Sequence, residues 1–87
     1  MKLKDGFVIR TIGSDTVAIY AGENTVDLKQ AIFLNETAEY IFRLLLEETN
    51  ESNLISALIK RYDISEQQAQ NDVKAFVSAL CVKGYLI

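Results

Sequence analysis

The side chains that could carry out catalysis are few in this sequence. Cys81 is its one cysteine, and none of its 87 residues is a histidine. A histidine base, a Cys–His pair and a Cys/His metal site within one chain are therefore excluded. Cys81 falls late in a predicted helix, far from the positive helix N-terminus that lowers thiol pKa values. We interpret it as a small buried hydrophobic residue, the usual role of a free cysteine. An enzyme that uses Cys81 is the alternative.

Carboxylates and glycines do not form a recognisable catalytic site either. Glu47 and Glu48 fall near the C-terminus of a predicted helix, where the helix dipole disfavours them, so we expect both to be exposed. Asp63 and Glu66 fall at helix ends, and Asp72 is better explained by a structural pairing than by catalysis. The four glycines, at positions 6, 13, 22 and 84, are too far apart for a phosphate-binding loop. We predict a protein that is not an enzyme, with no catalytic residues, metal site or cofactor.

The composition favours one small domain spanning residues 1–87. Hydrophobic residues make up 49% and charged residues 24%, as in ordinary globular proteins. The formal net charge of −3 disfavours nucleic acid as a partner. No apolar run approaches the roughly 18 residues of a membrane span, and the N-terminal MKLKDGF lacks the apolar region of a secretion signal. We therefore expect a cytoplasmic protein with no membrane partner.

The first part of the chain is predicted to form a sheet. Three segments are β-branched or alternate between apolar and polar residues, which is typical of strands: Phe7–Ile12, Thr16–Ala21 and Val26–Leu34. The connections contain glycine, and they are short enough for antiparallel hairpins. The sequence therefore predicts a three-stranded antiparallel meander.

Three helices are predicted to follow, over Glu36–Glu48, Glu51–Tyr62 and Glu66–Lys83. Their starts are indicated by Asn35, by Thr49-Asn50 and by Ser65, residue types that cap helix N-termini. Gly84 suits the position after the last helix, and the apolar tail behind it is expected to fold back onto the body. The fold class is α+β: a three-stranded antiparallel sheet packed on a three-helix bundle, winged-helix-like, in the order β-β-β-α-α-α.

This architecture is consistent with two hypotheses for a binding function. If the strand order follows the sequence, the third strand is an edge, where an extended peptide can add as a further strand. The winged-helix likeness also suggests a small DNA-binding regulator. However, the third helix carries Glu66 and Asp72 beside Lys74 and several amides, and it has no arginine.

The sequence also resembles the PqqD family along nearly its whole length. The pieces that carry the resemblance are, in chain order, Leu34-Asn35-Glu36-Thr37-Ala38, Ile41, Leu44-Leu45, Leu58, Tyr62-Asp63-Ile64, Ala69, Asp72-Val73, Phe76-Val77, Leu80 and Gly84-Tyr85-Leu86-Ile87. The resemblance implies a stand-alone recognition element for ribosomally made, post-translationally modified peptides (RiPPs). Such an element is a peptide chaperone that binds the leader region of a precursor peptide and presents it to a modifying enzyme. In this family the enzyme is often a radical S-adenosylmethionine protein, and the leader adds beside the third strand, against the third helix. An adaptor for a lasso-peptide leader peptidase is an alternative, and the open edge makes a homodimer plausible.

Carried onto this chain, the resemblance implies a peptide-binding groove between the third strand and the third helix. Its expected residues are Leu28, Lys29, Gln30, Ala31, Ile32, Phe33, Gln70, Val73, Lys74, Val77 and Cys81. The sequence leaves both faces of the third strand as candidates for lining the groove. Phe33 either faces the groove or belongs to a second small core behind the sheet. Lys74 either meets an acidic leader residue or is a solvated lysine.

Overall fold

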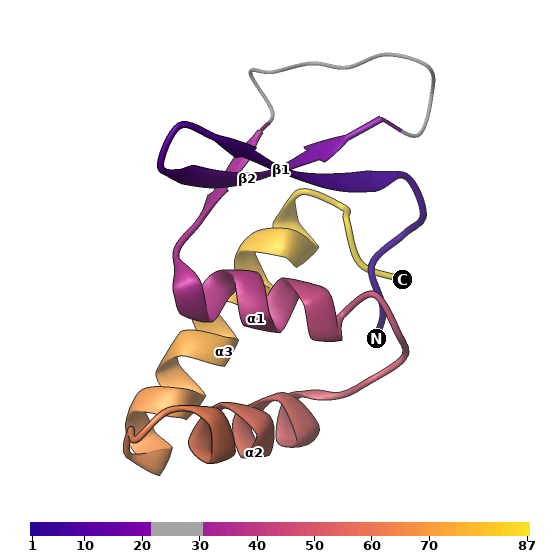
Figure 1. Ribbon diagram of the computed structural model, residues 1–87. Helices are drawn as coiled ribbons and strands as arrows, with labels where there is room; N and C mark the ends of the chain where they lie inside the picture. Colours follow the sequence, from indigo (N-terminus) through magenta and orange to yellow (C-terminus); the bar gives the residue numbers. More distant parts are fainter. Residues whose placement is uncertain (22–30) are drawn as a thin grey trace.

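Three antiparallel strands followed by three helices make up the computed structural model, which describes residues 1–21 and 31–87. The elements are β1 (Phe7–Ile12), β2 (Asp15–Tyr20), β3 (Ile32–Leu34), α1 (Glu36–Leu44), α2 (Glu51–Arg61) and α3 (Glu66–Val82). In Figure 1, α1 lies between the sheet and α2, and α3 runs past both helices toward the sheet. This winged-helix-like α+β architecture confirms the predicted fold class. The part of the third strand predicted over residues 26–30 lies outside the described residues.

Over residues 1–21 and 31–87, the sheet is a meander of order β1-β2-β3, so β3 is an edge strand there, as predicted. Ala18 of β2 pairs with Ile9 of β1 and Ile32 of β3, and these three side chains pack on the main core. The next pair across β2 and β3, Val17 with Phe33, points to the other face of the sheet because side chains alternate along a strand.

All three helices start at the residues predicted to cap them. The side-chain oxygens of Asn35, Asn50 and Ser65 accept hydrogen bonds from backbone N–H groups in the first turn of α1, α2 and α3. At the end of α3, Gly84 has φ +75. The N–H of Tyr85 donates to the carbonyl of Leu80, which closes a Schellman-type cap.

The first helix ends at Leu44, four residues earlier than predicted. The cause is the N-terminal segment. The N–H of Leu3 donates to the carbonyl of Leu45 (2.8 Å), and the N–H of Thr49 donates to the carbonyl of Met1 (2.9 Å). A tertiary contact therefore takes over the backbone groups that a longer helix would have used, and the sequence pattern could not show it.

The core lies between the sheet and the helices, and both chain ends close it. Phe42, Leu54 and Leu58 are fully buried at its centre. Leu3 and Leu86 form an isolated antiparallel bridge, and the two ends of the chain lie close together in Figure 1. Tyr85 is buried and its ring lies 4.9 Å from that of Phe7. The predicted folding back of the C-terminal tail is therefore confirmed.

The interpretation of Cys81 as a buried residue is wrong, because its side chain is exposed. The buried stripe of α3 runs through Ala69, Val73, Val77 and Leu80. Cys81 follows Leu80 directly, and one residue turns a helix by about 100°, so the thiol points away from the core.

Among the described residues, no helix is long and apolar enough to cross a membrane.

Candidate functional site

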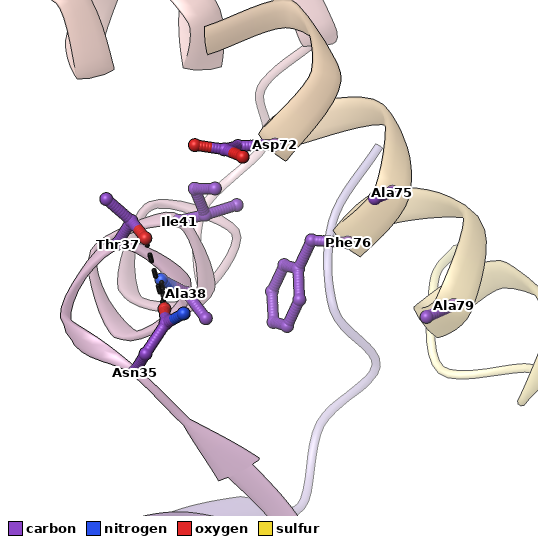
Figure 2. A pocket seen from close by; sticks show the side chains of 8 residues that line it. All are labelled: Asn35, Thr37, Ala38, Ile41, Asp72, Ala75, Phe76 and Ala79. Atoms are coloured by element: carbon purple, nitrogen blue, oxygen red, sulfur yellow. Dashed lines mark hydrogen bonds between the residues drawn. The ribbon is translucent and has the colours of Figure 1, made fainter. Parts of the chain in front are cut away.

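A hollow of about 280 Å³ opens where β3 ends and α1 begins, between α1 and α3. We call it the α1–α3 hollow. Its lining residues are Asn35, Thr37, Ala38, Ile41, Asp72, Ala75, Phe76 and Ala79. Figure 2 shows the first four on the side of α1 and the other four on α3, which faces them across the opening.

The α1 side of this hollow is fixed by the helix cap. Asn35 Oδ1 accepts hydrogen bonds from the Ala38 N–H (2.8 Å) and from Thr37 Oγ1 (3.0 Å), both visible in Figure 2. The cap therefore defines the angle between β3 and α1. It also occupies the carboxamide oxygen of Asn35. On this side the half-buried Ala38 is the apolar contact surface, and Ile41 lies buried beneath it.

The α3 side combines an apolar floor with one carboxylate. The Phe76 ring packs edge-on near the Phe42 ring, with their centroids 6.4 Å apart, so its position depends on the core. Ala75 and Ala79 are exposed, and their small side chains keep the hollow open. Asp72 accepts a hydrogen bond from Gln68 Nε2 (2.8 Å), so it pairs with an amide on its own helix. Such a surface can bind apolar side chains.

The described part of the predicted strand site forms the free edge next to this hollow. Ala31 and Ile32 are half-buried, whereas Phe33 is 71% exposed. Ile32 packs against the core, so Phe33 points outward and does not belong to a second core behind the sheet. Leu28, Lys29 and Gln30 lie outside the described residues.

None of the predicted helix residues lines the α1–α3 hollow. Val73 and Val77 are buried in the core. Gln70 and Lys74 line a separate hollow between α2 and α3. Cys81 is exposed and does not line either hollow. The face of α3 that meets α1 carries Asp72, Ala75, Phe76 and Ala79 instead.

Sequence reasoning missed those four residues, although a signal was present. They recur at helical spacing on one side of the buried stripe, whereas Gln70 and Lys74 lie on its other side. The choice between the two sides depends on where α1 and α2 pack.

The described residues contain no group of three or more His, Cys, Asp or Glu side chains that could hold a metal ion.

Comparison with known protein families adds a decisive observation. A sequence model described as coenzyme PQQ synthesis protein D (PqqD) matches residues 16–86. The chain belongs to the PqqD family. The match spans β2, β3 and all three helices, and it therefore includes both the free edge and the α1–α3 hollow.

A solved structure supports the fold of this PqqD-family chain. This chain is similar, with a TM-score of 0.73 and 23% sequence identity, to the protein in "TbiB1 in Complex with the TbiA(beta) Leader Peptide". The similarity covers 99% of this chain and 94% of the other. No curated protein sequence matches this chain.

Proposed function

We propose that this PqqD-family chain is a non-catalytic adaptor that binds the leader region of a ribosomally made precursor peptide. The leader adds as a fourth strand along the free edge of β3. Its inward side chains then reach the α1–α3 hollow, and the bound leader is presented to a modifying enzyme. Residues 1–87 act as one peptide-binding domain.

The observation that carries this proposal is an apolar hollow that begins at Asn35, directly where an edge strand ends. Backbone groups on the free edge supply affinity, and a side-chain pocket beside it supplies selectivity, as in other cases of strand addition. Family membership supports the same role, and so does the similar fold of a protein solved with a leader peptide.

The proposed contacts are Ala31, Ile32 and Phe33 on the strand, with Leu28, Lys29 and Gln30 before them. On α3 the hollow adds Asp72, Ala75, Phe76 and Ala79. Gln70, Lys74 and Cys81 are exposed or half-buried on another side of the helix. They fit better as contacts to the modifying enzyme, which we infer from the family to be a radical S-adenosylmethionine protein.

An NMR titration tests the proposal. The labelled chain is titrated with the leader half of a precursor peptide encoded beside its gene. We expect shifts concentrated in residues 31–35 and on the Asp72–Ala79 face of α3. Shifts confined to the α2–α3 hollow would contradict the proposed site, and no shifts near a millimolar peptide concentration would contradict leader binding. Sedimentation of the free chain over a range of concentrations tests whether a second copy occupies the same edge.

A further inference from the structure

The exposed ring of Phe33 is not explained by packing within the chain. Phe33 is 71% exposed, and it is the one aromatic side chain among the described residues that is largely open to solvent. It pairs across the sheet with Val17, which is fully buried but lies outside the main core cluster. The ring therefore lies on the outer face of the sheet, at the β3 edge, beside an apolar side chain that is itself buried.

A strand added to β3 would reach this ring whichever direction it ran. Side chains of an added strand alternate between the two faces of the sheet. Those on the inner face point toward the α1–α3 hollow, and those between them lie on the outer face. A residue directly opposite Phe33 would have its Cβ about 4.5–5.5 Å away, close enough for side-chain packing.

The surroundings of Phe33 define what that outer residue can be. A second hollow of about 600 Å³ adjoins the ring, lined by Ser14, Asp15, Thr16, Phe33, Leu34, Asn35, Glu36 and Glu39. Among the residues that the structure describes, no lysine or arginine lines this hollow, and Glu39 is already paired with Arg43 (2.9 Å). The ring favours an apolar partner, and the carboxylates repel a negatively charged one.

We propose that Phe33 is a second specificity contact, which packs against a large apolar side chain that the leader presents on the outer face of the sheet. This inference rests on the proposed function, because it requires a strand at the β3 edge. It adds that the leader is selected on both faces. The leader residues on the inner face bind in the α1–α3 hollow, and a leader residue between them, on the outer face, contacts Phe33.

The test uses a phage-displayed library of random twelve-residue peptides, selected against four forms of the full chain. These are the wild type, Phe33→Thr, Phe33→Leu and the control Ile12→Thr. Ile12 is 56% exposed on the same outer face, but it lies on the opposite edge strand. Threonine keeps a strand-favouring residue at each position, and thermal unfolding confirms that each variant is folded.

We expect peptides selected by the wild type to alternate apolar inner residues with a large apolar outer residue, and to be depleted in Asp and Glu at the outer position. For the consensus peptide, Phe33→Thr should weaken binding roughly 3- to 10-fold, the range for aromatic cross-strand pairs. Phe33→Leu should retain most of the affinity, and Ile12→Thr should change it less than about twofold, as expected for a site without contact. Alanine at the outer peptide position should weaken binding to the wild type but not to Phe33→Thr.

The possible failures are distinguishable. Unchanged binding by Phe33→Thr, or an equal loss in Ile12→Thr, overturns the Phe33 contact and leaves leader binding intact. An absence of enriched peptides, or NMR shifts away from residues 31–35, overturns strand addition itself and this inference with it.

Discussion

At the scale of single residues, the proposed leader-binding site combines small side chains with large ones. Phe76 and Ile41 provide the apolar floor of the α1–α3 hollow, and Ala75 and Ala79 keep it open. Both alanines are exposed, so neither is required for the core. They separate the effect of the hollow on binding from its effect on stability.

We expect Ala79→Leu to weaken leader binding roughly tenfold or more, because overpacking a site costs about 1–3 kcal/mol. The free energy of unfolding should change by less than about 0.5 kcal/mol, as is usual at exposed positions. Isothermal titration calorimetry and chemical denaturation measure the two quantities.

Ser78→Leu is the matched control for this variant. Ser78 is the exposed neighbour of Ala79 on α3 and does not line the hollow, so its substitution should leave the affinity unchanged. Equal loss in both variants would remove the α1–α3 hollow from the binding site.

At the scale of elements, the edge of β3 provides the backbone groups of the proposed site. In the described part of the sheet, β3 pairs with β2 on one side only. Successive backbone N–H groups of an antiparallel strand point in opposite directions. The N–H of Phe33 therefore points to one side of β3, and the N–H groups of Ile32 and Leu34 point to the opposite side.

Amide hydrogen exchange by NMR should resolve this alternation. In the free chain, we expect the N–H groups that face the open edge to exchange fast, and those paired with β2 to be protected. Leader binding should slow the exposed set by more than about tenfold, because each of these groups gains a backbone acceptor. The amides of β1, on the far edge, serve as the internal control.

Exchange rates in β3 that stay the same in a saturated complex would contradict strand addition. Equal slowing in β1 and β3 would indicate a general stabilisation of the sheet. In that case the protection would not report contact with the peptide.

At the scale of the whole molecule, the two ends of the chain close a small core. Leu3 is only 2% exposed, belongs to the core cluster and bridges Leu86. The backbone of the same segment pairs with Leu45, Thr49, Tyr85 and Ile87. The N-terminal residues therefore connect the helices to the C-terminal tail.

We expect Leu3→Ala to destabilise the chain by about 2–5 kcal/mol, the usual cost of truncating a buried leucine. This is a large part of the total stability of a small domain, which is about 5–15 kcal/mol. Leu46→Ala is the control, because Leu46 is 46% exposed and its loss should cost less than about 1 kcal/mol. Denaturant unfolding measures both, and similar costs would show that the N-terminal segment does not help to close the core.

The sequence by itself determined the elements, their order and the family. Strand alternation, the caps at Asn35, Asn50 and Ser65, and the glycine after the last helix are local signals, because the responsible atoms lie within a few residues of one another. The same alternation gives the outward direction of Phe33 only after the structure has placed Ile32 and Leu34 against the core.

Only the tertiary structure decided how the elements meet. Helical periodicity gives the buried stripe of α3, but it does not tell which flank of that stripe contacts α1 and which contacts α2. The expected helix residues Gln70 and Lys74 therefore lie beside α2, whereas Asp72 and Phe76 line the candidate site. The early end of α1 has the same kind of cause, since it depends on the distant N-terminal segment that pairs with Leu45 and Thr49.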